Sequence, residues 1–436
     1  MTSLLILAFT ILLLIVAVTV LKIHPIAVLL IAGLLLGLAT GGSVESVTES
    51  LLSGFGNTLK WIGLVILFGT LLGEILAETG GADIIADSVI QLFGINRLPL
   101  GMAVIGLLVG IPVFMDVAYL TLLPTMAALS RKSGQSILVL GLCLAISLTV
   151  AHALIPPTPG PLAVTALLEI NIGEIIPLNI VVALVAITGG LLWIMINSSK
   201  FDLPSLGDQG KSTSKSQQLR GFKRILPFAA LLVPLLLMSL GSLLPWKNPL
   251  IDFIKNPVWA LMIGVCLVLP LIGKKGFSKR LDKFFQMAGA KSAIVILITG
   301  AGGAFGQVIK DTEIVNGLFS EMGPTSLSSW GIAIPFLLSF LFTSVTGSIT
   351  VSLITSASIM APLVTNGTMD PALTSAAIGA GSLGIIHVNS SFFWLFKEVH
   401  DVPVSKLLKS FSILSAIVAL SGGGLVFLLY YLTKAN

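Results

Sequence analysis

Long apolar runs follow one another along most of the chain, and short polar segments separate them. Runs of about 17–25 apolar residues can cross a bilayer as helices. The runs are continuous rather than alternating, which favours helices over strands. The pattern predicts eight straight spans and two broken ones: 4–21, 25–41, 59–76, 176–196, 225–245, 257–273, 292–309 and 410–432, with breaks within 136–168 and 371–396.

Two further apolar segments, 99–130 and 332–364, do not fit a straight span. Each contains prolines and a polar centre, with Asp116 in the first and SVTGS (344–348) in the second. Proline breaks a helix because it lacks an N–H group and clashes with the preceding turn. We interpret both segments as re-entrant hairpins that enter and leave on the same side of the membrane.

The positions of lysine and arginine predict the orientation. Cytoplasmic segments of membrane proteins are enriched in these residues. With both hairpins re-entrant and the N-terminus outside, most of the 24 Lys and Arg fall on the cytoplasmic side. Lys291 is among them, just before the span predicted from 292. Both termini are therefore expected outside, and the first run, which lacks a basic leader and a cleavage site, is expected to be a retained span.

The two halves of the chain resemble each other. GEILAET (73–79) aligns with GQVIKDT (306–312), and GLCLAISLTVAH (141–152) aligns with AAIGAGSLGIIH (376–387), at offsets of 233–235 residues. Each half has five spans and one hairpin, so the second half begins on the opposite side. The predicted fold is an all-α polytopic membrane protein of two inverted-topology repeats, each with five spans, one of them broken, plus one re-entrant hairpin. The predicted division is 1–197 for the first repeat, 198–224 for a cytoplasmic linker and 225–436 for the second repeat.

Composition agrees with a membrane location and excludes other classes. The chain is 55% hydrophobic and 10% charged, whereas soluble domains have roughly 25% charged residues. The net charge of +5 does not indicate nucleic acid, because topology explains the basic loops. The sequence contains no nucleophile elbow, metal-ligand spacing or phosphate loop, so neither an enzyme nor a metal site is expected. GAGGAFG (300–306) has Phe305 at the last glycine position and no preceding strand, which favours helix packing over dinucleotide binding.

The broken spans carry the candidate chemistry. AHALIPPTPGP (151–161) places four prolines at membrane depth, and HVNSSFF (387–393) interrupts the second half at the matching place. Backbone freed there must be buried in protein or line a polar cavity. Helix starts and free N–H groups attract an anion. We therefore expect an anionic small molecule to bind where the breaks and hairpin tips meet.

The candidate substrate-binding and proton-coupling residues are chosen by the chemistry of their side chains. Intramembrane acids are costly and usually functional, and histidine can change charge near neutral pH. Hydroxyl, amide and bare backbone groups suit a polyol acid. The predicted substrate-binding residues are Asp116, His152, Thr158, Gly160, Thr346, Gly347, Ser348, His387, Asn389 and Ser390. The predicted proton-coupling residues are Asp116, Glu74 and His152, although Glu74 also fits a plain helix-to-helix hydrogen bond.

IPVFMDVAY (111–119) followed by AHALIPPTPGPL (151–162) resembles the bacterial gluconate permease family, the gluconate:proton symporters, over essentially the whole chain. The resemblance implies carriage of D-gluconate or a similar sugar acid, with D-serine in one branch. It also implies a scaffold and a transport domain, a homodimer and an elevator-like motion in the bacterial inner membrane.

The expected function is therefore import of a hydroxylated carboxylate by proton symport, with no cofactor beyond the coupling ion. Protonation of Asp116 would remove its repulsion of an anionic substrate and add a donor. Three alternatives stay open at this point. They are sodium coupling, a facilitator without coupling, and another hydroxy acid such as D-serine as the substrate.

Overall fold

The computed structural model describes residues 21–198, 224–243, 256–312, 331–388 and 390–435, together with 6, 9–10, 12–14, 16–17, 249 and 253–254. Within these residues the secondary structure is helical and contains no strand. This confirms the all-α prediction. Half of the residues in the predicted span at 4–21 lie outside the described residues, and so does the predicted linker except for Ser198 and Arg224.

Several described helices have membrane-spanning character. Four stretches are long and apolar enough to cross a membrane: Ile137–Leu167, Ile172–Asn197, Phe277–Asp311 and Val404–Lys434. Val44–Lys60 and Gly63–Glu78, which meet at a bend of 44°, form a fifth if taken as one span. Shorter apolar helices occupy the other predicted spans and hairpin arms, among them Pro25–Ala39 and Ile349–Thr365.

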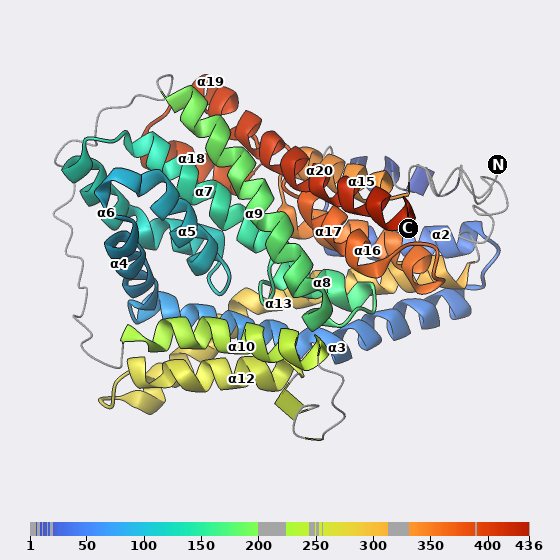
Figure 1. The fold of residues 1–436 in the computed structure, drawn as a ribbon. Helices are drawn as coiled ribbons and strands as arrows, with labels where there is room; N and C mark the ends of the chain where they lie inside the picture. The colour runs from blue at the N-terminus through green and yellow to red at the C-terminus, as the bar shows by residue number, and fades with distance from the viewer. Residues whose placement is uncertain are drawn as a thin grey trace.

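The helices form two groups in space (Figure 1). The first lies along the lower edge of the figure, where α3 packs along α13 and α10 packs on α12. α2 also packs on α13. The bounds in this group are α2 (Pro25–Ala39), α3 (Val44–Glu78), α10 (Leu226–Leu243), α12 (Pro257–Val268) and α13 (Phe277–Asp311).

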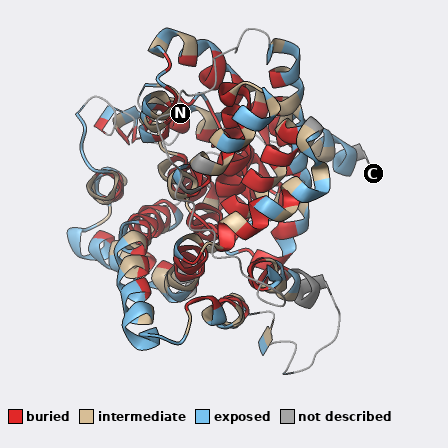
Figure 2. Ribbon diagram, turned by 90° about the vertical axis from the view of Figure 1, so that its left-hand side faces the viewer, coloured by how far each residue is buried: buried red, intermediate tan, exposed pale blue. Residues whose placement is uncertain are grey.

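The second group forms the block above this layer (Figure 1). α7 lies at its centre (Figure 1), and all of its residues are buried. Figure 2 shows buried residues concentrated in the interior helices and exposed ones on the outer helices. The main bounds are α4 (Gly81–Phe93), α5 (Leu98–Gly110), α6 (Met115–Ser133), α7 (Ile137–Leu154), α8 (Pro159–Leu167), α9 (Ile172–Asn197), α15 (Ala333–Thr346), α16 (Ile349–Thr365), α17 (Pro371–Gly381), α18 (Ser391–His400) and α20 (Ile413–Ala435). Short helical segments at Ile95–Arg97, Leu269–Leu271, Val404–Leu407 and Leu408–Ser412 complete the described elements.

The two segments predicted as re-entrant hairpins each form a helix–turn–helix unit, and their re-entry into the membrane stays a prediction. α5 and α6 are joined by residues 111–114, and α15 and α16 by Gly347 and Ser348. Gly347 has φ +72°, a conformation that L side chains rarely adopt, so it ends α15 and reverses the chain. Ser348 then caps α16 by accepting a hydrogen bond from Val351 N.

Both predicted breaks are also present. The first runs from Ile155 to Thr158, between α7 and α8, and Pro159 begins α8 at a position where a missing N–H costs nothing. The second covers 382–390, between α17 and α18. Prolines interrupt the first helix, and the second break contains the polar run HVNSS (387–391).

Glycines allow close helix packing both within the first group and between the two groups. A Cβ on Gly303 of α13 would lie 1.9 Å from Thr58 Oγ1 of α3, and one on Gly302 would lie 2.6 Å from Ile354 of α16. The prediction that GAGGAFG packs helices is therefore confirmed. On α3, a Cβ on Gly73 would lie 1.9 Å from the carbonyl oxygen of Pro112. The tip of the first hairpin thus rests directly on the α3 backbone.

The structure corrects the predicted starts of two spans and adds one helix. α3 begins at Val44 rather than near 59, and α13 begins at Phe277 rather than near 292. Their first turns are rich in polar residues, so apolar runs mark only the later part of each helix. Lys291 consequently lies within α13 and not in a loop before it. α4 was not predicted, because its apolar residues are interspersed with Asp and Gln.

We expect Gly73→Ala to destabilise the protein. The added methyl would push the Pro112 carbonyl away from α3, and overpacking of this kind costs about 1–3 kcal/mol. Gly56→Ala is the matched control, because Gly56 lies on the same helix and a Cβ there meets nothing within 4 Å. Thermal unfolding in detergent should show a lower Tm for Gly73→Ala and no loss for Gly56→Ala. Equal Tm values for the two variants would contradict this packing.

Candidate functional site

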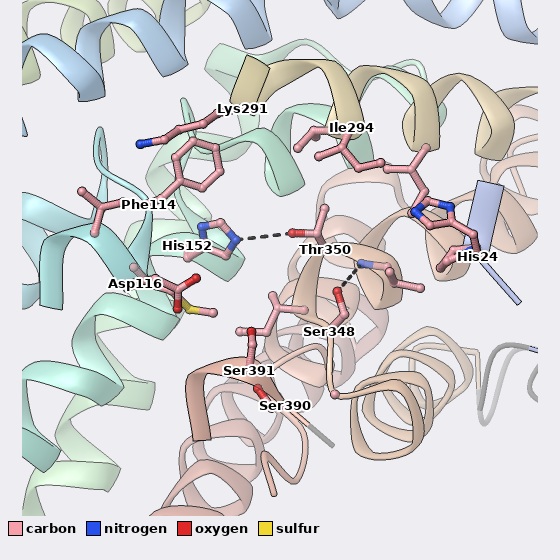
Figure 3. Close-up of a pocket in the computed structure, with 18 residues that line it drawn as sticks. His24, Phe114, Asp116, His152, Lys291, Ile294, Ser348, Thr350, Ser390 and Ser391 are labelled. Carbon is pink, nitrogen blue, oxygen red and sulfur yellow. Dashed lines mark hydrogen bonds between the residues drawn. The ribbon is translucent and has the colours of Figure 1, made fainter. Parts of the chain in front are cut away.

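A cavity of about 480 Å³ lies between α13 and the tips of the hairpins and broken helices (Figure 3). In the figure Asp116 and His152 lie on one side, His24 on the opposite side, and Ser348, Ser390 and Ser391 below. α13 forms the wall above. The lining residues are His24, Pro25, Phe114, Met115, Asp116, Val117, His152, Lys291, Ile294, Val295, Ile298, Gly347, Ser348, Ile349, Thr350, Val351, Ser390 and Ser391.

Most of this lining comes from the starts of four helices. α2 begins at Pro25, α6 at Met115, α16 at Ile349 and α18 at Ser391. The first N–H groups of a helix have no intrahelical acceptor, and a helix start carries roughly half a positive charge. The start of α6 and the start of α18 have no side-chain cap. The cavity is therefore surrounded by backbone donors that favour an anion.

Asp116 and His152 face the cavity with unused hydrogen-bonding capacity. His152 Nε2 lies 3.4 Å from Thr350 Oγ1 of the second hairpin. Within the described residues, Asp116 Oδ1 and His152 Nδ1 have no hydrogen-bond partner. Buried polar atoms are normally paired, so two unpaired ones beside one cavity mark Asp116 and His152 as candidate functional residues. The two hairpins thus meet across the cavity, with Asp116 on one and Thr350 on the other.

Lys291 adds a positive charge to the cavity wall. Its Nζ lies 2.5 Å from Glu74 Oε1, and this ion pair joins α13 to α3. The Glu74 side chain is 4% exposed and the Lys291 side chain 35% exposed. Glu74 does not line the cavity itself. Of the two uses predicted for Glu74, a helix-to-helix contact is present, and its partner is a lysine.

The cavity brings together five predicted substrate-binding residues from distant parts of the chain. Asp116 comes from the start of α6, His152 from the end of α7, Gly347 and Ser348 from the second hairpin, and Ser390 from the start of α18.

Two predicted residues of the first break lie away from this cavity. Thr158 is buried, and its hydroxyl donates to the carbonyl oxygen of Ile155 at 2.6 Å. Gly160 provides close packing, because a Cβ there would lie 2.4 Å from Leu353 of α16. The carbonyl of Leu154 accepts from Asn179 Nδ2 at 2.8 Å. Side chains of the protein thus satisfy carbonyl groups at the first break.

Three other predicted residues have different placements. Thr346 donates its hydroxyl hydrogen to the carbonyl oxygen of Phe342 at 2.7 Å. His387 Nε2 donates to the carbonyl oxygen of Ser344 at 2.7 Å, which ties the second break to the second hairpin. Neither residue lines the cavity. Asn389 lies outside the described residues.

Sequence reasoning missed two lining residues with chemical character. Lys291 was assigned to a cytoplasmic segment, because the apolar run of its helix begins only after it. His24 was assigned to a loop, whereas it caps α2 by accepting from Ile26 N and lines the cavity. The available signal for Lys291 was its position between two apolar stretches, FFQMAGA before and SAIVILI after.

Comparison with known proteins identifies relatives along the whole chain. Residues 2–432 match the model of the GntP family permease. A gluconate permease from Pseudomonas aeruginosa is 34% identical over 96% of this chain and 95% of its own length. The Gnt-II system L-idonate transporter of Escherichia coli is 29% identical over 92% of this chain and 93% of its own. The high-affinity gluconate transporter of Escherichia coli is likewise 29% identical, over 92% and 93%.

A solved structure supports the fold. The Alcanivorax borkumensis YdaH transporter, described as having an unusual topology, superposes with a TM-score of 0.72. The match covers 94% of this chain and 99% of that one at 13% sequence identity. At this identity the likeness concerns the fold alone. Together with the membrane-length helices, the family match makes this chain a multi-pass transporter of the bacterial inner membrane and not an enzyme. The chain belongs to the GntP permease family.

Proposed function

We propose that this protein imports a hydroxylated carboxylate, with D-gluconate as the first candidate, by symport with protons. The observation that carries the proposal is the cavity itself, where four helix starts and Lys291 surround one space of about 480 Å³. That volume lies within the range of roughly 300–1,000 Å³ typical of small-molecule sites. The names of the relatives support the substrate class, since gluconate and L-idonate are both six-carbon sugar acids.

The lining offers suitable contacts for the carboxylate, the hydroxyls and the carbon backbone of such a molecule. A carboxylate fits the backbone N–H groups at the helix starts. The hydroxyls of Ser348, Thr350, Ser390 and Ser391 can each donate and accept, as a chain of substrate hydroxyls requires. Ile294 and Ile298 of α13 supply an apolar wall for the carbon backbone. Hydrogen-bond recognition of hydroxyls discriminates more strongly than an apolar pocket does.

Asp116 is the first candidate to carry the proton. It lies at the start of α6, beside the cavity, and its Oδ1 is unpartnered within the described residues. An ionised Asp116 and a substrate carboxylate would repel each other, and a protonated Asp116 would instead offer a donor. Substrate and proton then bind cooperatively, and the coupling is reciprocal. His152 and Glu74 are the further candidates. Their partners are Thr350 and Lys291, respectively.

We also propose the inverted repeat, 1–197 and 225–436 around the linker 198–224, with both termini outside. Both halves contain the same series of elements: a long helix, a hairpin, a broken pair of helices and a last helix. In the first half these are α3, α5–α6, α7–α8 and α9. In the second half they are α13, α15–α16, α17–α18 and α20. GEILAET and GQVIKDT end α3 and α13. The family resemblance favours a homodimer in which the second group of helices, which contains both hairpins (the hairpin block), moves against the first group, which contains α3 and α13 (the α3–α13 layer).

Uphill transport tests the function directly. We expect purified protein in liposomes to accumulate radiolabelled D-gluconate when the outside is made more acidic than the inside and sodium is absent. A protonophore should collapse the accumulated pool, because the proton gradient supplies the energy. Protein-free liposomes are the control. Uptake that only equilibrates would favour a facilitator, and uptake that requires a sodium gradient would replace proton coupling by sodium coupling.

Asp116→Asn tests the proton carrier. The amide keeps the size of the side chain but cannot take up the proton, so proton-driven accumulation should fall by about 5- to 150-fold, the usual range of coupling between two sites. Exchange of internal for external D-gluconate should persist. Asp282→Asn, at an exposed position of α13, should accumulate as well as the unaltered protein. Full pH-dependent accumulation by Asp116→Asn would exclude Asp116 as the carrier.

A further inference from the structure

Lys291 is a partly exposed lysine of α13 in the wall of the cavity, and the proposed function counts its charge without assigning it a contact. We propose that Lys291 binds the carboxylate of the substrate and sets the preference of the site for anions, while Glu74 holds its ammonium group in position. This inference rests on the proposed function, because it assumes that the cavity takes a carboxylate.

The geometry gives Lys291 spare donors. An ammonium group has three N–H donors. Glu74 Oε1, at 2.5 Å from Nζ, accounts for one of them. The side chain of Glu74 is buried, whereas that of Lys291 is partly exposed and lines the cavity. Glu74 therefore leaves two of the three ammonium donors unused, and these could serve a bound carboxylate.

Charge balance explains why the pair is built this way. A lone lysine at membrane depth is costly, and Glu74 neutralises it while the site is empty. Long lysine side chains are flexible, so the contact with Glu74 also fixes where the ammonium lies. Glu74 is thus a positioning residue, and Lys291 is the group that touches the substrate.

The corresponding place in the second half of the chain lacks this charge. The offset of 233 residues that relates the halves aligns Glu74 with Gln307 and Lys291 with Thr58. Thr58 and Gln307 line a smaller cavity of about 100 Å³, and Thr58 donates to the carbonyl oxygen of Gly54. A Glu–Lys pair is therefore not a general requirement for packing α3 on α13. The smaller cavity has an ion pair of its own, Lys310 with Glu169, but that pair does not involve α3.

Binding of an anion at Lys291 would also favour the binding of a proton. The titratable groups that line the cavity are Asp116 from α6, His152 from α7 and His24 at the start of α2, and Glu74 from α3 contacts the Lys291 ammonium. A substrate carboxylate added to the neutral Glu74–Lys291 pair leaves one surplus negative charge. That charge favours simultaneous uptake of one proton by this group of side chains.

Binding of a charged and an uncharged ligand separates an anion-binding role from a structural one. The probes are D-gluconate and D-glucitol, a neutral polyol of the same chain length, measured by calorimetry on detergent-purified protein. Lys291→Gln should weaken D-gluconate binding by roughly 10- to 100-fold, the loss of one hydrogen bond to a charged group. D-glucitol binding should change little, so the preference for the anion should shrink by the same factor. Lys291→Arg should recover part of it.

Lys291→Gln leaves Glu74 unpaired and could misfold for that reason alone. A double variant separates this effect from a loss of anion binding. Glu74→Gln with Lys291→Gln removes both charges, and it should fold yet still lack the preference for D-gluconate. Lys310→Gln is the matched control. Lys310 lies on the same helix and pairs with Glu169 at 3.3 Å beside the smaller cavity, so its loss should leave the preference unchanged.

The outcomes separate this proposal from the function on which it rests. Recovery of the D-gluconate preference in the double variant would show that Lys291 serves only the ion pair, and it would overturn the proposal. An unchanged preference in Lys291→Gln would do the same and would place the carboxylate at the helix starts. Failure of the unaltered protein to bind D-gluconate would overturn the proposed substrate and this inference with it.

Discussion

The first N–H groups of a helix have no intrahelical acceptors, and this constraint governs the lining of the cavity. Four helices begin around one cavity, at Pro25, Met115, Ile349 and Ser391. Hydrocarbon cannot satisfy these donors, so they must face polar atoms or water. The arrangement that solves this problem for the backbone is the same one that attracts an anion. In the proposed function, fold and binding thus share one physical cause.

The α3–α13 layer supplies a fixed wall for that cavity. Glycines on both helices remove the side chains that would hold the backbones apart, and Gly73 lets the Pro112 carbonyl of the first hairpin rest on α3. Small residues are the common means of close helix packing where no hydrophobic effect drives association. The Glu74–Lys291 pair joins the same two helices at the edge of the cavity. A single layer thus sets the position of the first hairpin tip and of the positive charge.

A second contact, within the hairpin block, fixes two of the helix starts relative to each other. Tyr119 OH on α6 lies 2.5 Å from His400 Nε2 on α18, and both are buried. Tyr119 also meets Phe392 edge to face, with ring centroids 5.6 Å apart. A Cβ on Gly141 of α7 would lie within 3 Å of both polar atoms. Asp116 and Ser391 stand at the starts of these same helices, so packing one to three turns away determines how they face the cavity.

The sequence by itself determined the helical class, the two hairpins and the two breaks. Apolar length and proline act locally, so each can be recognised without knowledge of the neighbours. It also singled out Asp116, His152, Gly347, Ser348 and Ser390, which the cavity brings together. Most of these residues are polar and lie where an apolar run is interrupted, a feature that can be recognised in the sequence.

Only the tertiary structure decided which interruptions face the cavity. Thr158 and Gly160 lie in the most proline-rich stretch, yet they are buried in packing, because Asn179 and Thr158 itself satisfy the nearby carbonyls. Lys291 was not recognised from the sequence, because the start of its helix looks like a loop. It lies within an apolar helix whose polar first turns resemble a loop, and its partner Glu74 is 217 residues away. Partner choice over such a separation is set by how α3 and α13 pack, which no local pattern encodes.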